Sequence, residues 1–222
     1  MEHVLEVLPD SRLLAQRAAE YVAGMARAAV SDHGCFSFAV SGGQTPWLMF
    51  AELAAEEVPW SSVEIFQVDE RVAVEGDPDR NLSHLRQALG AAPATVVPMR
   101  VNDSDLDGAA DAYARLLPDR FDLIHLGLGP DGHTASLVPG DPVLEVSDRL
   151  VGVTLPYDGH RRMTLTYLAL ARAEQLLWLV AGSDKRDPLS KLLVGDRSIP
   201  AGRVEAGSSL IFADAAAAAP PG

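Results

Sequence analysis

The sequence has little cysteine and no long apolar run. Cys35 is the only cysteine among 222 residues, so an internal disulfide is excluded, and the scarcity fits a reducing compartment. No apolar stretch reaches the ~18 residues that a membrane-spanning helix needs. The N-terminus lacks a basic segment followed by an apolar one, so no secretory signal is expected. We therefore expect neither a disulfide scaffold nor a membrane protein.

Basic residues are also scarce, and the formal net charge is −13. A nucleic-acid surface would be basic, so we expect no nucleic-acid partner. A small anionic substrate stays compatible with this charge, because charges more than ~8 Å apart are largely screened at physiological salt. A few arginines close to the site can then bind such an anion despite the negative net charge. Lys185 and Lys191 are the only lysines, which makes each a candidate for a specific role.

Strand-like apolar runs alternate with helical patterns, and a hydrophobic content of 48% supplies a core. We expect strands near residues 3–8, 35–40, 63–68, 95–97, 150–154, 163–165, 176–181 and 209–212, with another starting at Phe121. Helices are expected near residues 11–30, 45–53, 82–89, 106–117, 166–173 and 184–194. This alternation predicts an α/β fold with a mainly parallel open sheet and helices on both faces, as in Rossmann-like folds. We expect one domain over residues 1–213 and a disordered alanine- and proline-rich tail over residues 214–222.

One expected strand ends in a candidate catalytic pair. The apolar run that starts at Phe121 breaks into glycines and a proline and then delivers Asp131 and His133. In open α/β sheets, ligands bind at the carboxyl ends of the strands. A carboxylate beside an imidazole orients the ring and stabilises its charged form. His133 is therefore the candidate base, and Asp131 either orients it or caps the loop.

A second strand end is a candidate phosphate site. Residues 41–46, Ser-Gly-Gly-Gln-Thr-Pro, lie between an expected strand and a helix, with Thr45 as a plausible N-cap. Glycines let backbone N–H groups approach a ligand, and a helix N-terminus favours an anion. A plain strand-to-helix turn would have the same spacing. A phosphate would also require basic side chains, and the candidates are Arg71, Arg161 or Arg162, Lys185 and Arg186.

Other kinds of site have weaker support. Residues 127–132 match G-x-G-x-x-G, but Pro139, Gly140 and Pro142 interrupt the helix that a dinucleotide site needs. The histidines form no H-x-x-x-H pair with a glutamate, and there is no cysteine cluster, so no metal is expected. His125, inside an apolar run, is expected to be a satisfied core or supporting histidine. The G-x-S-x-G elbow of serine hydrolases is missing.

Several motifs together resemble the 6-phosphogluconolactonase family. They occur in that family's order and span most of the chain: residues 41–46, 68–71, Asn81, 127–137, 162–166 and 182–185. The resemblance implies hydrolysis of 6-phospho-D-glucono-1,5-lactone to 6-phosphogluconate, in the cytoplasm and without metal or organic cofactor. It also implies a fold shared with glucosamine-6-phosphate deaminases and isomerases. We expect a monomer or weak homo-oligomer whose only partner is the sugar-phosphate lactone.

The resemblance also implies residue roles. His133 would be the general base on water, and Arg71 with nearby backbone N–H groups would contact the oxyanion or sugar hydroxyls. Asp69 would bind sugar hydroxyls or fix Arg71. Gly129 belongs to the expected substrate-binding set, and the 6-phosphate would be held by Ser41, Gly42, Gly43, Arg162 and Lys185.

The related deaminases are the closest alternative. They carry a glutamate five residues after the histidine, where this chain has Val138, and an aromatic residue where it has Arg71. Both differences favour the lactonase. One departure from the lactonase pattern is Arg80, where serine is usual. A non-catalytic sugar-phosphate sensor is the third alternative, although a sensor has no need for a base.

Overall fold

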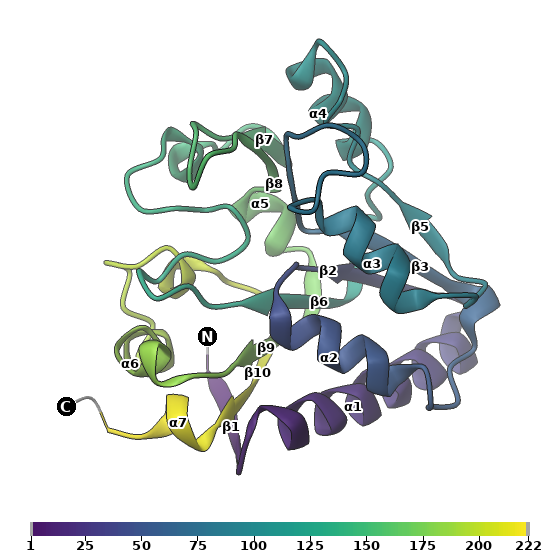
Figure 1. The fold of residues 1–222 in the computed structure, drawn as a ribbon, viewed down its shortest axis with the longest axis vertical. Helices are drawn as coiled ribbons and strands as arrows, with labels where there is room; N and C mark the ends of the chain where they lie inside the picture. Colours follow the sequence, from purple (N-terminus) through teal and green to yellow (C-terminus); the bar gives the residue numbers. More distant parts are fainter. Residues whose placement is uncertain (1, 221–222) are drawn as a thin grey trace.

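A seven-stranded parallel sheet forms the centre of the molecule, which the computed structural model describes over residues 2–220 (Figure 1). Its strands lie in the order β1-β10-β9-β6-β2-β3-β5. They are β1 (His3–Leu8), β2 (Phe36–Val40), β3 (Val63–Gln67), β5 (Thr95–Val97), β6 (Phe121–Gly127), β9 (Ala173–Val180) and β10 (Ser208–Asp214). The chain runs from β2 outward to β5, returns to β6, and continues toward the other edge. The strand order therefore reverses between β2 and β6, where open α/β sheets bind their ligands.

Helices cover both faces of this sheet. The helices are α1 (Ser11–His33), α2 (Gln44–Leu53), α3 (Asn81–Leu89), α4 (Leu106–Ala114), α5 (Tyr167–Leu170), α6 (Arg186–Leu193) and α7 (Ala215–Ala218). The side chains of β9 alternate between two cores: Leu177 and Leu179 pack with α1 and α2, whereas Leu176 and Trp178 pack with α4 to α6. Each face of a buried parallel sheet needs such a cover. The predicted α/β fold with a mainly parallel sheet is confirmed.

The long helix α1 shows how local sequence sets these elements. Asp10 caps its start, where the carboxylate accepts hydrogen bonds from the N–H groups of Arg12 and Leu13 at 3.0 and 2.9 Å. Gly34 ends it in the left-handed conformation, with φ of 89°. A stripe of buried alanines faces the sheet and lets the helix approach closely. The helix extends to His33, slightly beyond the predicted end near residue 30.

A second, three-stranded antiparallel sheet was not predicted. It consists of β4 (Asp69–Arg71), β8 (Arg162–Leu165) and β7 (Val151–Val153), in that order. Figure 1 places β7 and β8 above the main sheet. Residues 69–71 follow the strand expected near residues 63–68, but they form a separate strand that pairs with β8. Because β4 and β8 are some ninety residues apart in the chain, no local sequence pattern predicts that they pair.

Two local predictions are wrong. Helix α2 begins at Gln44 rather than after a Thr45 cap, because Gly43, at φ of 132°, turns the chain one step earlier. The tail over residues 214–222 was expected to be disordered, but Ala215–Ala218 form α7. The Asp214 carboxylate caps this helix by accepting from the Ala217 N–H at 2.7 Å. Residues 221 and 222 lie outside the described part of the chain.

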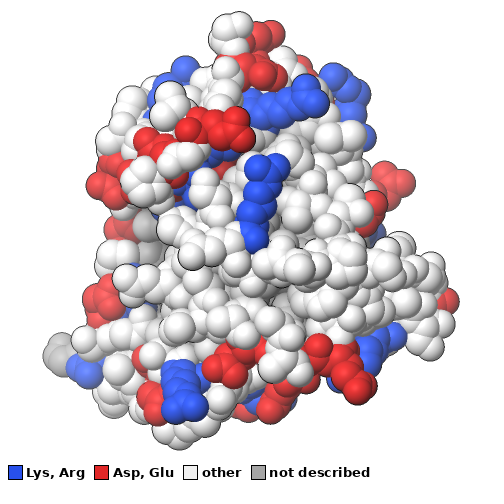
Figure 2. All heavy atoms as spheres, turned by 45° about the vertical axis from the view of Figure 1, so that its right-hand side comes forward, with Lys and Arg blue, Asp and Glu red and all other residues white. Residues whose placement is uncertain are grey.

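The surface carries its charge in small groups. On the face drawn in Figure 2, acidic and basic side chains alternate along the upper and lower parts, with a broad uncharged area between them. None of the helices within residues 2–220 is long and apolar enough to cross a membrane.

Candidate active site

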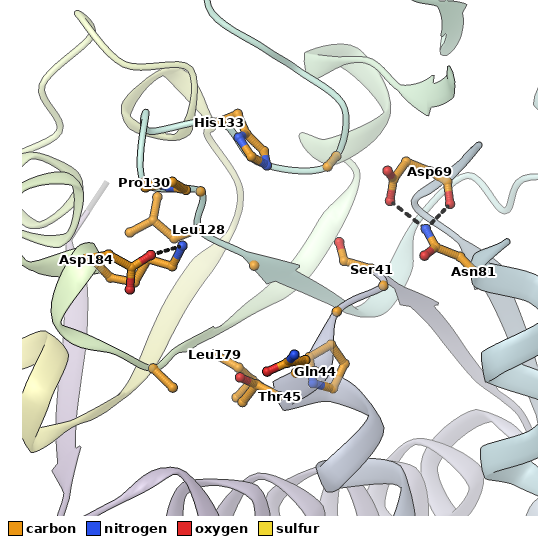
Figure 3. A pocket seen from close by; sticks show the side chains of 18 of the residues that line it. Ser41, Gln44, Thr45, Asp69, Asn81, Leu128, Pro130, His133, Leu179 and Asp184 are labelled. Atoms are coloured by element: carbon orange, nitrogen blue, oxygen red, sulfur yellow. Dashed lines mark hydrogen bonds and ion pairs between the residues drawn. The ribbon is translucent and has the colours of Figure 1, made fainter. Parts of the chain in front are cut away.

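A pocket of about 400 Å³ lies where the carboxyl ends of β2, β6 and β9 meet. Its lining includes His133 and all the predicted substrate-binding residues: Ser41, Gly42, Gly43, Asp69, Arg71, Gly129, Arg162 and Lys185. In Figure 3, His133 lies across the pocket from Gln44 and Thr45, and Asp69 and Asn81 close one side. Asp131 is not part of the lining, but its carboxylate contacts the ring of His133. The structure therefore brings together the expected catalytic pair and all the expected substrate-binding residues.

The Ser41–Gly43 turn forms one wall of this pocket. Ser41 is buried, and its Oγ atom has no hydrogen-bond partner within the described chain. Gly42 lies so close to Asn81 that a Cβ atom here would be 1.9 Å from Asn81 Oδ1. The first turn of α2 follows at once, so backbone N–H groups and the positive end of the helix dipole face the pocket. This wall has the properties of an anion site.

His125 supports this turn from below. It is fully buried in β6, and its Nδ1 atom accepts a hydrogen bond from the Ser41 N–H at 3.3 Å. Burial lowers the pKa of His125 to about 3, so the ring is neutral at physiological pH. Its Nε2 atom has no partner among the described residues. The expectation of a supporting histidine is therefore confirmed in position, but only one ring nitrogen is satisfied.

The Asp131–His133 pair lies opposite the turn. Asp131 Oδ1 is 2.6 Å from His133 Nδ1 and also accepts from the His133 backbone N–H at 3.1 Å. The carboxylate thus both orients the ring and caps the loop. Burial raises the pKa of Asp131, but the hydrogen bonds and charge of His133 outweigh this and hold it below the ordinary value. Because Nδ1 faces Asp131, Nε2 is the ring nitrogen left to take up a proton.

Gly129 makes room for the His133 ring. A Cβ atom at this position would lie 2.1 Å from His133 Nδ1, far inside contact distance. The Gly129 N–H donates to the His133 carbonyl at 2.8 Å, so it is not free to bind a ligand. Gly129 was predicted to bind substrate, and the structure puts it in the pocket lining chiefly as space for His133.

Two arginines stand opposite each other on the pocket wall. Arg71 of β4 is the cross-strand partner of Arg162 of β8, an arrangement that is unfavourable for like charges. The Nε atoms of both are buried without a hydrogen-bond partner in residues 2–220. Burial lowers the pKa of Arg162, the nearby charge of Arg71 lowers it further, and Asp69 opposes both effects. An anion between the two guanidinium groups would relieve this repulsion.

The neighbouring basic residues differ in position. Arg161 is not part of the pocket lining, is exposed, and donates from Nε to the Thr154 carbonyl at 3.3 Å. Arg186 donates to the Ala216 carbonyl at 2.9 Å and is not part of the pocket lining. Lys185 does line the pocket, and its Nζ atom lies 2.9 Å from Asp184 Oδ2. The sequence alone left Arg161 and Arg162 equivalent; the geometry separates them.

Asp69 is held by residues to which the sequence analysis assigned no role. Ser136 donates its hydroxyl to Asp69 Oδ2 at 2.6 Å, and Asn81 Nδ2 donates to the Asp69 carbonyl at 3.1 Å. Asn81 Oδ1 in turn accepts from Arg71 at 2.9 Å. Both residues stood in the family motifs, Asn81 by itself and Ser136 within residues 127–137, and that was the signal in the sequence. Asp184, another lining residue, was also missed.

Behind the pocket, a buried group of residues fixes β4 to α3. We call Glu70, Arg80 and Gln67 the Glu70 network. The Glu70 carboxylate accepts from Gln67 Nε2 and from the N–H groups of Arg71, Asn81 and Leu82, all at 2.8 to 2.9 Å. Arg80 Nε lies 3.1 Å from Glu70 Oε2 as an ion pair without hydrogen-bond geometry. Arg80 Nη1 donates to the Ala73 carbonyl and to Asn102 Oδ1, both at 3.0 Å. The unusual Arg80 is therefore a structural partner of Glu70.

Other site types remain unsupported. Within residues 2–220 no group of three or more histidine, cysteine, aspartate or glutamate side chains is arranged to hold a metal ion. After the glycines of residues 127–132, the next described α-helix is α5, which begins only at Tyr167. The G-x-G-x-x-G match thus lacks the helix N-terminus that binds a pyrophosphate.

Comparison with known proteins identifies the family. The family model for glucosamine-6-phosphate isomerases/6-phosphogluconolactonase matches residues 9–212. A 6-phosphogluconolactonase of Nostoc sp. is 32% identical over 237 residues, covering 99% of this chain and 98% of that protein. The crystal structure of a 6-phosphogluconolactonase from Shewanella baltica superposes with a TM-score of 0.87 at 28% identity, covering 96% of this chain and 98% of the other.

The fold reaches beyond the lactonases. A monomeric glucosamine-6-phosphate deaminase is only 17% identical but superposes with a TM-score of 0.85, covering 98% of this chain and 99% of its own. The expected fold shared with the deaminases is confirmed. With its motifs, its pocket and these relatives in agreement, the chain belongs to the glucosamine-6-phosphate isomerase/6-phosphogluconolactonase family.

Proposed function

We propose that this chain hydrolyses 6-phospho-D-glucono-1,5-lactone to 6-phosphogluconate, the lactone step of the oxidative pentose phosphate pathway. The observation that carries the proposal is one pocket that combines a histidine–carboxylate pair with two opposed, incompletely bonded arginines. The first suits activation of water, and the second suits a phosphorylated substrate. The names of the relatives, 6-phosphogluconolactonases over nearly the whole chain, support the same reaction.

The phosphate is assigned to the Ser41–Gly43 turn, with Arg162 and Lys185 as its charged partners. A phosphate monoester carries roughly −1.5 to −2 charges at pH 7 and offers three acceptor oxygens. The unpaired Ser41 Oγ and Arg162 Nε are donors of the required kind. Lys185 now contacts Asp184, and an arriving phosphate competes with that carboxylate for the ammonium group. Because its phosphate is bound, the lactone carbonyl is held in place beside the attacking water, and hydrolysis becomes effectively unimolecular.

Hydrolysis then needs a base, an oxyanion site and an acid. His133 Nε2 removes a proton from water, whose oxygen forms a bond to the lactone carbonyl carbon. Arg71 stabilises the tetrahedral oxyanion or binds an adjacent hydroxyl. When the oxyanion collapses, the bond from this carbon to the ring oxygen breaks, and the protonated His133 gives its proton to that oxygen. Asp131 stabilises the imidazolium throughout, and Asp69 binds sugar hydroxyls or fixes Arg71 through Asn81.

The proposal also covers the extent of the domain, its cellular location, its oligomeric state and its need for cofactors. We propose one domain over residues 1–213 that acts in the cytoplasm as a monomer or weak homo-oligomer. No step above requires a metal or an organic cofactor. The net charge of −13 argues against a nucleic-acid partner.

Deaminase activity is disfavoured by one position. Val138 replaces the glutamate that deaminases use in ring opening, and its side chain is buried outside the pocket lining. An isopropyl group has no proton to transfer. A non-catalytic sensor is disfavoured by the Asp131–His133 contact, which a binding protein would not need.

One experiment separates these functions. The purified chain is given the phosphorylated lactone, and acid release is measured against the spontaneous rate, in parallel with an ammonia assay on glucosamine 6-phosphate. We expect lactone hydrolysis well above background and no ammonia. Ammonia release would replace the lactonase with a deaminase. Tight binding of the sugar phosphate without turnover of either substrate would leave a sensor.

A further inference from the structure

A tight hairpin near the pocket presents Tyr157. Residues 154–161 join β7 to β8, and Tyr157 and His160 form an antiparallel bridge across the turn. Asp158 and Gly159 both have positive φ, 50° and 83°, as two-residue hairpin turns require. His160 Nε2 lies 3.0 Å from Asp79 Oδ2, which ties the turn to the loop before α3. The backbone therefore fixes the direction in which Tyr157 projects.

Tyr157 contacts both the Asp131–His133 pair and Arg162. Its hydroxyl donates to Asp131 Oδ2 at 3.3 Å. Its ring meets the His133 ring edge to face, with the centroids 5.6 Å apart, and the Arg162 guanidinium lies 5.0 Å from its centroid. Tyr157 is not part of the pocket lining, and its contacts are with side chains that line or flank the pocket. No motif in the sequence had pointed to this residue.

We propose that Tyr157 is a positioning residue that couples the acid–base pair to the phosphate-binding arginine. The proposal rests on the function proposed above. Asp131 uses Oδ1 for His133 and Oδ2 for Tyr157, so the two bonds together fix the plane of the carboxylate. The aromatic face meanwhile holds the Arg162 guanidinium through a cation–π contact.

The hydroxyl also tunes the base. Burial raises the pKa of Tyr157 and the charge of Asp131 raises it further, so the hydroxyl stays a donor across the neutral range. Its bond draws negative charge away from the side of Asp131 that faces the imidazole. Loss of the bond leaves that charge to stabilise protonated His133, which then holds its proton to higher pH. The other charged groups that face this pocket are Asp69, Arg71, Arg162, Asp184 and Lys185, and the substitution of Tyr157 by phenylalanine retains all of them.

Two variants separate the two contacts. Tyr157→Phe keeps the ring over Arg162 and removes only the hydroxyl, so we expect kcat to fall roughly 3–10-fold with KM nearly unchanged. The acid limb of kcat/KM should move up by roughly half to one pH unit. Tyr157→Leu also removes the aromatic face, so KM should rise as well. The control is Tyr167→Phe, because Tyr167 likewise carries an arginine, Arg203, over its ring and donates its hydroxyl to the Pro200 carbonyl.

A second measurement does not depend on turnover. The ring protons of His133, assigned by their loss in His133→Asn, are titrated by NMR without substrate in the wild type, Tyr157→Phe and Tyr167→Phe. We expect a higher midpoint only in Tyr157→Phe. Superimposed curves for Tyr157→Phe and the wild type would overturn the proposal. Failure of the lactonase assay with a shifted midpoint would instead remove the proposed function and leave the Tyr157 coupling. The nearly isosteric variant Tyr157→Phe tests the proposed coupling even if Tyr157→Leu does not fold.

Discussion

Glu70 and Arg71 are neighbours in β4, but the charge of Glu70 is well bonded within the protein whereas that of Arg71 is not. Glu70 points into the Glu70 network, where its carboxylate receives four hydrogen bonds and the charge of Arg80. Arg71, the next residue, points to the pocket side, opposes another arginine and leaves its Nε atom unbonded among the described residues. A strand alternates its side chains between two faces, so one short element serves both purposes.

The difference shows how buried charge separates structure from function. A buried carboxylate that receives four hydrogen bonds and faces an opposite charge holds its neighbours in place, and removing one partner of such an ion pair is costly. A buried ion whose donors are left open gains its missing bonds only when a ligand arrives. Substitutions in the Glu70 network should therefore change stability first, whereas substitutions on the pocket side should change kinetics first. The predictions below test this division.

The largest effect is expected at His133. Replacement by asparagine removes the base, so kcat should fall roughly 10²–10⁴-fold while the melting temperature changes little. Steady-state kinetics and thermal melts measure the two effects. The control is His33→Asn, because His33 also pairs with a carboxylate, that of Asp122 at 3.0 Å, but at the opposite end of the sheet. Near-wild-type turnover of His133→Asn would remove this residue from the role of base.

Glu70→Gln should give the reverse pattern. The variant leaves Arg80 buried without its counter-charge, so the free energy of unfolding should drop by about 3–5 kcal/mol. Urea unfolding measures the loss. In the matched control Glu205→Gln, which breaks the exposed ion pair with Arg197, the change should stay below about 1 kcal/mol. Equal losses in the two variants would contradict the structural role of the network.

Gly129→Ala tests whether the pocket needs space rather than a donor here. The added methyl group overlaps the His133 ring, so the ring must move, and a displacement of this kind costs roughly 10²-fold in kcat. Gly24→Ala makes the same change on α1, where a Cβ atom meets only Arg27 Nη2 at 4.0 Å. That control should have normal kinetics. An unimpaired Gly129→Ala enzyme would mean that His133 works from another position.

Arg162→Gln should raise KM for the phosphorylated lactone roughly 10–100-fold, because a charge-assisted hydrogen bond to the phosphate is lost. Its stability should be unchanged or slightly higher, since the repulsion between Arg71 and Arg162 is relieved. Arg161→Gln, at the exposed adjacent position, is the control and should leave KM unchanged. If only Arg161→Gln raised KM, the phosphate assignment would move to that residue.

The smallest effect concerns the stability contribution of Asp131. Its pKa is held below the ordinary carboxylate value of 3.8, so its contribution is present at neutral pH and is lost as the pH falls through the lowered value. Asp131→Asn should therefore unfold slightly more easily at pH 7, by less than about 1 kcal/mol because the group is partly exposed. The gap between variant and wild type should narrow as the pH falls below 3.8. A gap that widens in acid would reverse the assigned sign.

Local sequence patterns predicted much of the fold and of the candidate site. The remaining features depend on contacts between segments that are distant in the chain. The parallel sheet followed from alternating strand and helix patterns, and the site residues followed from motifs at strand ends. The pairing of Arg71 with Arg162, and the choice of Arg162 over Arg161, needed the β4–β8 register. Tyr157 stands in no motif, and Ser136 stands in one without an assigned role, so both roles became visible only in the folded chain. The α7 helix was missed because composition outweighed a single capping residue, Asp214.

Within residues 2–220, the first strand has only the last strand as its sheet neighbour. β1 lies at the sheet edge and pairs with β10, from His3 opposite Ser209 to Leu8 opposite Asp214. During synthesis, residues 3–8 leave the ribosome long before residues 208–214 exist. The edge strand must therefore remain undocked until β10 has been synthesised, so closure of this sheet edge follows the docking of the intervening strands. A truncation that removes β10 would also release the opposite end of the polypeptide.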